Sequence, residues 1–223
     1  MLSYRLSEIV KLCKNHTRIA DVGCDHGKVL GELAKNGANF LVASDISEPS
    51  VKKAEQLLTK LNFKNFDVRV GDGFETLSDS DNLDLIIVAG MGGLEIIQIL
   101  KNSKIKLTNL ILQPQNNVVR LREYLCNNNF YVQLDYVICD KDKFYNIIKV
   151  KKDNKFHKLT KREITFGKTN LKTFNPEFIS MLENLNFKLA NRVQGIKDES
   201  LKNEIIKTIK ENNVEIERAK NRR

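Results

Sequence analysis

The sequence lacks closely spaced cysteines and any apolar run long enough to cross a membrane. Its four cysteines, Cys13, Cys24, Cys126 and Cys139, are scattered and form no Cys-x-x-Cys pair. This spacing argues against a zinc site and a disulfide framework, and it favours reduced thiols in the cytoplasm. No apolar run approaches the roughly 20 residues of a membrane span, and Met1–Arg5 does not begin a secretory signal. We therefore expect a cytoplasmic protein that binds neither a metal nor a membrane.

The first two thirds of the chain also lack an excess of charge of either sign. Residues 1–150 hold 19 Lys and Arg against 18 Asp and Glu, whereas residues 151–223 hold 18 against 10. Nearly all of the net charge of +9 therefore lies in the last third. A basic segment beside a neutral one favours a polyanionic partner, with nucleic acid first. A general enrichment in lysine is the alternative, but the balance in the first 150 residues argues against it.

Short apolar runs alternate with helical patterns through the first 150 residues, which predicts an α/β fold. We expect strands at Ile19–Val22, Phe40–Ser44, Phe66–Val70, Leu83–Ala89, Leu110–Leu112, Tyr131–Cys139 and Phe144–Val150. Helical patterns lie near His26–Asn36, Glu48–Leu61, Leu94–Lys101 and Val118–Asn128. The alternation predicts parallel strands joined by right-handed crossovers. Only four residues separate the last two strands, so these should form an antiparallel hairpin.

The pattern changes after Asn175-Pro176. Apolar residues recur at steps of three and four, first at Phe178, Met181, Leu182, Leu185, Leu189, Val193 and Ile196, then at Leu201, Ile205, Ile209 and Ile216. This spacing predicts two amphipathic helices in an antiparallel coiled-coil hairpin, although a parallel coiled-coil dimer remains an alternative. In the linker before them, Thr160-x-x-Glu163 and Phe166-Gly167 predict the start and end of one short helix. We divide the chain into domains 1–152 and 153–223 and expect a monomer.

The segment Asp21-Val22-Gly23-Cys24-Asp25-His26-Gly27 points to a ligand site. An apolar run ends in a carboxylate and turns through glycines into a helical pattern, as in the nucleotide pockets of parallel β/α proteins. Glycine allows the backbone to approach a ligand closely. Asp25 stands where a dinucleotide site would have its second glycine, and its carboxylate would repel a pyrophosphate. The same carboxylate suits a ligand with an ammonium or sulfonium group, and S-adenosylmethionine carries both.

Polar residues and glycines also follow the next three strands. Parallel strands bring their carboxyl ends to one edge of the sheet, so these groups should share one crevice. Asp45 suits a ribose diol, and Asp72 suits an adenine amino group with Phe74 or a neighbour against the ring. Alone, each could be a helix cap or a turn, but together they favour a site. The predicted cofactor-binding residues are Gly23, Asp25, Gly27, Asp45, Ile46, Asp72, Gly73, Ala89, Gly90 and Met91.

These motifs resemble the bacterial tRNA (adenine-22 N1)-methyltransferase family. The matching residues are Arg5-Leu6, the segment 21–27, Gly71-Asp72-Gly73, Ala89-Gly90-Met91-Gly92-Gly93, and Leu110-Ile111-Leu112-Gln113-Pro114 followed by Leu121-Arg122. The resemblance covers essentially the whole chain. It implies the Rossmann-like seven-stranded sheet of class I methyltransferases, S-adenosylmethionine as donor, tRNA as acceptor and N1-methyladenosine as product. The sequence departs from the family at Cys24, where Ser is expected, and at Gly27-Lys28, both beside the methyl group.

Adenine N1 carries its own lone pair, so the protein has to expose and align it rather than supply a nucleophile. Asp21 is the first candidate to hold the adenine amino group and stabilise the positive charge that methylation creates. Asp25 with His26 is the second candidate, and Asp21 could instead organise the amino-acid end of the cofactor. For substrate binding we predict Arg5, Gly92, Gln113, Pro114 and Arg122. The two arginines suit tRNA phosphates, although either could form a structural ion pair.

Other functions fit parts of this pattern. A small-molecule methyltransferase with a helical dimerisation tail is the main alternative. A non-catalytic RNA-binding protein with a vestigial pocket is a further one, although the intact Asp45, Asp72 and glycines argue against decay. An NAD-linked dehydrogenase is disfavoured, because the phosphate-binding glycine pattern is missing.

Overall fold

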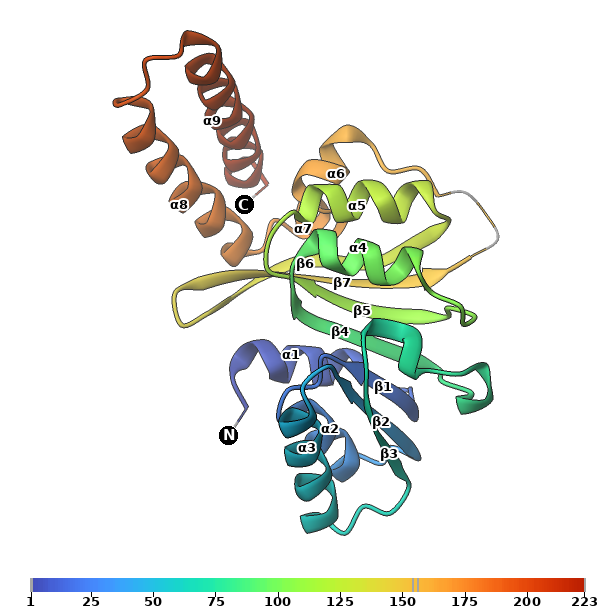
Figure 1. The fold of residues 1–223 in the computed structure, drawn as a ribbon. Coiled ribbons are helices and arrows are strands. Elements are labelled where there is room, and N and C mark those ends of the chain that lie inside the picture. Colours follow the sequence, from blue (N-terminus) through green and yellow to red (C-terminus); the bar gives the residue numbers. More distant parts are fainter. Residues whose placement is uncertain (1, 154, 156, 223) are drawn as a thin grey trace.

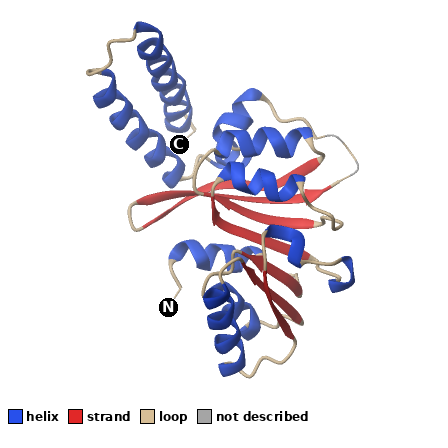
Figure 2. Ribbon diagram, in the orientation of Figure 1, coloured by secondary structure: helices blue, strands red, loops and turns tan. Residues whose placement is uncertain are grey.

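A seven-stranded sheet organises the chain in the computed structural model (Figures 1 and 2), which describes residues 2–153, 155 and 157–222. The strands are β1 (Arg18–Val22), β2 (Phe40–Asp45), β3 (Phe66–Val70), β4 (Leu85–Met91), β5 (Asn109–Pro114), β6 (Phe130–Asp140) and β7 (Lys143–Lys152). Their order is β3-β2-β1-β4-β5-β7-β6. Strands β3 to β5 run parallel, whereas β7 is antiparallel to both β5 and β6. This arrangement confirms the predicted class I methyltransferase sheet.

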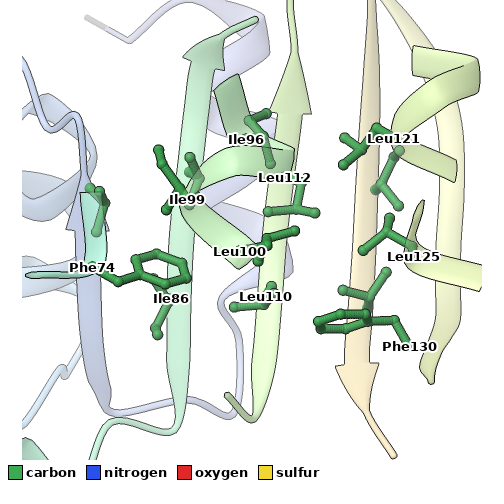
Figure 3. Close-up of a cluster of buried hydrophobic side chains, with 14 of the residues drawn as sticks. Phe74, Ile86, Ile96, Ile99, Leu100, Leu110, Leu112, Leu121, Leu125 and Phe130 are labelled. Carbon is green, nitrogen blue, oxygen red and sulfur yellow. The ribbon is translucent and has the colours of Figure 1, made fainter. Parts of the chain in front are cut away.

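Helices cover both faces of the sheet, because alternate residues of the central strands point to opposite sides. Ile19 packs in an apolar cluster with α1 (Tyr4–Leu12), α2 (Lys28–Lys35) and α3 (Glu48–Lys60). Ala20 and Val22 belong to the opposite cluster, with α4 (Gly93–Lys101) and α5 (Val118–Asn127), part of which Figure 3 shows. Asp21 therefore lies on the same face of β1 as Ile19, toward α1 to α3.

Two helices were missed by the sequence prediction. Helix α1 begins after Ser3, whose hydroxyl accepts a hydrogen bond from the Leu6 N–H, and it buries Ile9 against the sheet. In the linker, the predicted helix α6 (Lys161–Phe166) has its capping box at Thr160, but a second helix, α7 (Lys168–Thr173), follows directly. Gly167 separates α6 from α7 with a φ of 89°, a backbone conformation that favours glycine. The sequence signal of a helix end was correct, but a new helix begins at once.

The last two helices, α8 (Pro176–Val193) and α9 (Glu199–Lys220), confirm the predicted antiparallel hairpin and project from the rest of the molecule (Figure 1). Asn186 on α8 accepts a hydrogen bond from Asn212 and donates one to Asn213 of α9. Paired amides inside a coiled coil fix the register of its helices. At its base the hairpin buries Phe178 in a cluster that includes Val137 of β6, so the helices and the sheet share a core.

A buried ion pair joins the sheet to the helices that follow it. The Arg122 side chain of α5 is 1% exposed, and its guanidinium donates to both carboxylate oxygens of Asp135 on β6, at 2.7 and 2.9 Å. It also donates to Asn146 of β7 and to backbone carbonyls at the end of α6. Beside it, the Thr169 hydroxyl accepts from the Asp135 N–H, which brings α7 into the same network. Five elements therefore meet around one guanidinium.

We expect Arg122→Met to lower the free energy of unfolding by about 3–5 kcal/mol, because the substitution leaves the Asp135 carboxylate buried without a partner. Urea unfolding at neutral pH measures this loss. The double variant Arg122→Met, Asp135→Leu removes both charges and should recover more than half of it. A single variant that loses less than about 1 kcal/mol, the usual value of a surface pair, would contradict a structural role.

Candidate functional site

The loop after β1 lies at the point where the strand order reverses, which is where open α/β sheets bind ligands. The N–H groups of Gly23 and Cys24 both donate to the carbonyl of Ser44 on β2. The Asp25 N–H donates to the Asp45 carboxylate at 3.0 Å, and the other oxygen of Asp45 accepts from the Ser47 N–H at 2.9 Å. Hydrogen bonds therefore hold the first loop against the end of the second strand.

A cavity of about 580 Å³ opens beside this loop. The predicted residues Asp21, Gly23, Asp25, His26 and Ala89 line it. The remaining lining residues are Leu2, Ser3, Arg5, Leu6, Cys24, Lys28, Val29 and Lys141. Helix α1 thus supplies one wall, and the β6–β7 turn contributes a lysine from more than 100 residues further along the chain. The acidic groups come from the β1 loop, whereas the cations come from the other elements.

Asp21 is the most perturbed acid of the cavity. Its side chain is only 4% exposed, and no cation of the described residues forms an ion pair with it. Burial, followed by the nearby carboxylates of Asp45 and Asp25, raises the pKa of Asp21 to about 7. A buried carboxylate in this state is stabilised by any positive charge or hydrogen-bond donor placed beside it. The cavity therefore favours a ligand that brings such a group.

The backbone of the loop is arranged for close approach. Gly23 has a φ of 75°, and a Cβ there would lie 2.3 Å from the Met91 methyl group. Gly27 has a φ of 65°, and a Cβ there would lie 2.7 Å from the Cβ of Ala54 on α3. Both positions therefore require glycine for conformation and for space. Met91, predicted as a cofactor contact, packs over Gly23 from the end of β4.

Asp25 and His26 are held at the rim rather than at the floor. Asp25 has a φ of 50°, and its side chain is 72% exposed. His26 Nε2 lies 2.9 Å from the Lys53 ammonium of α3 and 3.4 Å from Asp25 Oδ1. A lysine donates its protons, so this contact favours the His26 tautomer with its proton on Nδ1. Of the three predicted catalytic residues, Asp21 is therefore the one enclosed by protein.

The residues predicted for the adenosine half lie at the ends of β2 and β3. Ile46 is 72% exposed, and Asp72 is exposed, as expected for side chains that await a ligand. Gly73, with a φ of 51°, is buried against Ile99. The prediction for Phe74 is wrong: its ring is 4% exposed and packs toward Ile86 in the core (Figure 3), so it does not lie open to an adenine.

The end of β4 forms a bulge at Gly90, whose φ is 81°. The Arg5 guanidinium reaches this bulge from α1 and donates a hydrogen bond to the Gln113 side-chain oxygen. Gln113 and Pro114 of β5 are both buried, so Gln113 positions Arg5 rather than facing a base directly. Gly92 caps α4, and its N–H donates to Glu95.

Comparisons with known proteins agree with this geometry. The family model of the tRNA (adenine(22)-N(1))-methyltransferases matches residues 19–220. The chain is 33% identical to the Bacillus subtilis tRNA (adenine(22)-N(1))-methyltransferase over 66% of this chain and 63% of that protein. It is 32% identical to MG248 of Mycoplasma genitalium, provisionally named a tRNA methyltransferase, over 73% of this chain and 76% of that protein. The structure of M. capricolum TrmK with S-adenosyl-homocysteine has a TM-score of 0.86 and 29% identity, covering 97% of this chain and 98% of that one.

The chain belongs to the tRNA (adenine(22)-N(1))-methyltransferase family. It is therefore an S-adenosylmethionine-dependent enzyme that methylates N1 of adenine 22 in tRNA. The predictions of family, donor and reaction are confirmed. The alternatives of a small-molecule methyltransferase, a vestigial pocket and a dehydrogenase are set aside.

The residues present fit the cofactor of this methyltransferase. S-adenosylmethionine carries a sulfonium and an ammonium group, and the cavity offers a buried carboxylate without a counter-cation and two glycines that admit a ligand to the backbone. Within the described part of the chain, no three His, Cys, Asp or Glu side chains gather as a metal site. In the same part, no helix is long and apolar enough to cross a membrane.

The prediction of Arg122 as a substrate-binding residue is wrong. Its guanidinium is buried and occupied by Asp135, so it is not available to a phosphate. Conversely, the sequence prediction missed Ser3, Lys28 and Lys141 as lining residues. Helical spacing around Ile9 would have revealed α1, but nothing in the sequence places the β6–β7 turn beside the β1 loop.

We expect Asp21 to make the stability of the folded methyltransferase fall as the pH rises. Its folded pKa of about 7 lies above the ordinary value of 3.8, so between these values the folded state keeps a proton that the unfolded state has lost. This contribution is present at low pH and is lost as the pH rises through about 7. Urea unfolding of wild type and Asp21→Asn at about pH 5 and about pH 8 should show the variant gaining relative to wild type at the higher pH.

A matched control for this measurement is Glu55→Gln, which neutralises an exposed carboxylate of α3 that does not line the cavity. Its difference from wild type should not change with pH. A pH-independent difference for Asp21→Asn as well would contradict the raised pKa.

Proposed function

We propose a residue-level account of the methyl transfer in which Asp21 holds the target adenine and stabilises the charge of the methylated base. One observation carries this assignment: a buried carboxylate without a partner cation lies in the cavity, with a pKa of about 7. Methylation at N1 makes the adenine ring cationic. An ionised carboxylate placed beforehand near the amino group of that ring stabilises the developing charge without reorganising during the reaction.

The residues around Asp21 would bind the cofactor. When bound, S-adenosylmethionine supplies a methyl group on a positively charged sulfur. Gly23 and Gly27 admit it to the backbone of the β1 loop, and the exposed Ile46 and Asp72 contact its adenosine from the neighbouring strand ends. Asp45 keeps two of its lone pairs on backbone N–H groups and retains capacity for a ribose hydroxyl. These residues thus orient the donor, while Asp21 faces the acceptor.

The helical part of the enzyme would bind tRNA away from the cavity. Lys188 and Arg192 lie one turn apart on α8, and Lys197 follows in the turn before α9. All three are exposed, and none has an ion pair with a described residue. Unpaired cations on a projecting hairpin suit phosphate contacts, which position a nucleic acid without reading its sequence. We infer a monomeric, cytoplasmic enzyme with residues 153–223 as its tRNA-binding domain.

Asp21→Asn should lower turnover on tRNA by about 100-fold or more, the usual loss when one preorganised electrostatic group is removed from an active site. Because the ionised form is needed, wild-type kcat/KM should rise as the pH passes through about 7, and the variant should lose that rise. Transfer of a labelled methyl group to tRNA measures both, with Glu55→Gln as the control.

Calorimetry on the same variant separates the two roles open to Asp21. Affinity for S-adenosylmethionine within about twofold of wild type supports a contact with the base, since twofold is well below the effect of a lost charge pair. A large loss of cofactor affinity would move Asp21 to the amino-acid end of the cofactor. Near-normal turnover on tRNA would refute both roles.

Neutralising the hairpin cations should weaken tRNA binding without changing the chemistry. We expect Lys188→Gln, Arg192→Gln, Lys197→Gln to raise KM for tRNA about tenfold and to reduce the salt dependence of binding by two to three phosphate contacts, at about 0.7–0.9 per contact. The matched control is Lys60→Gln, Lys64→Gln, Lys104→Gln, which removes three exposed cations from the sheet region. Equal effects of both triple variants would mean that only the net charge matters.

A further inference from the structure

The turn between β6 and β7 is held in a conformation that its sequence does not favour. Lys141 has a φ of 51° and Asp142 a φ of 61°, so both central residues of the two-residue turn are left-handed. Asn-Gly and Asp-Gly are the usual residues of such turns, because lysine in this conformation is strained. Backbone strain persists only where the surroundings impose it, and it concentrates at functional sites.

Contacts with α1 impose this conformation. The Asp140 carboxylate, which begins the turn, accepts a hydrogen bond from the Arg5 N–H at 3.0 Å. Together with a hydrogen bond from the Ser3 side chain, this contact lowers the pKa of Asp140. The tip of a long hairpin is therefore fixed to the start of α1, whose residues form one wall of the cavity.

The result is a lysine at the mouth of the active-site cavity. Lys141 is exposed and lines the cavity, and no described carboxylate forms an ion pair with it. In Figure 1 the β6–β7 tip extends between α1 and the base of α8, and both of these helices contact β6. An RNA that spans the α8–α9 hairpin and the cavity would pass this tip.

We propose that Lys141 binds a backbone phosphate next to the target adenine and so holds the unstacked nucleotide in the cavity. This inference rests on the proposed function. The floor of the cavity is acidic, which excludes phosphate there, whereas the rim is cationic. A base that leaves its stack carries its flanking phosphates to the rim of the pocket. A lysine fixed at that rim offsets part of the energy of unstacking, because it pairs with a phosphate only when the base is inside.

The test uses Lys141→Asn in the full-length enzyme. Asparagine tolerates the left-handed backbone, so the turn is retained while the charge is lost. We expect KM for tRNA to rise about fivefold and the salt slope of tRNA binding to fall by about one phosphate contact. The melting temperature, kcat and the affinity for S-adenosylmethionine should not change. Lys141→Arg keeps the charge and should restore KM.

Lys143→Asn is the matched control, because Lys143 is exposed in the same turn but does not line the cavity. Equal effects of Lys141→Asn and Lys143→Asn, or no effect of either, would overturn the proposal. A loss of cofactor affinity in Lys141→Asn without a change in KM for tRNA would also overturn it and assign the lysine to the cofactor carboxylate. Failure of the proposed function is distinguishable, since Asp21→Asn would then retain turnover on tRNA.

Discussion

A carboxylate buried at the end of β1 without a counter-cation sets the conditions for the rest of the site. Asp21 points into the layer between the sheet and helices α1 to α3, where water is scarce and two other carboxylates lie nearby. Its charge is therefore unfavourable in the free protein and becomes favourable beside a cationic partner. The glycines of the following loop and the wall supplied by α1 serve to admit such a partner and to keep water out.

The site divides its charges between the floor and the rim. Carboxylates come from the ends of β1 and β2, because parallel strands direct these ends to one edge. Cations come from α1, α2 and the β6–β7 turn, which approach the same edge from outside the sheet. This division suits a reaction in which the donor and the product base are positively charged and the acceptor nucleotide carries phosphates. The unpaired cations of the α8–α9 hairpin extend the same logic along the substrate.

The Arg122 network explains how a projecting hairpin keeps its orientation relative to the cavity. One guanidinium binds β6 through Asp135, β7 through Asn146 and the end of α6 through backbone carbonyls. Because these bonds are buried, the helices cannot move without leaving a charge unpaired. A second pair, Arg162 of α6 with the buried Glu215 of α9, holds the far helix in the same way. The tRNA-binding surface and the active site are thus parts of one packed unit.

The sequence by itself determined the sheet, the helical hairpin and the acidic loop, because these depend on local signals. Apolar runs of strand length, the three- and four-residue spacing after Asn175, and Asp21 before Gly23 can each be read without knowledge of distant residues. Only the tertiary structure decided which polar residues meet. Arg122 and Arg5 look alike in sequence, yet Arg122 is buried on Asp135 whereas Arg5 reaches the cavity. Phe74 entered the core, and Lys141 came to the cavity mouth, because burial and long-range strand pairing depend on the whole fold rather than on neighbours along the chain.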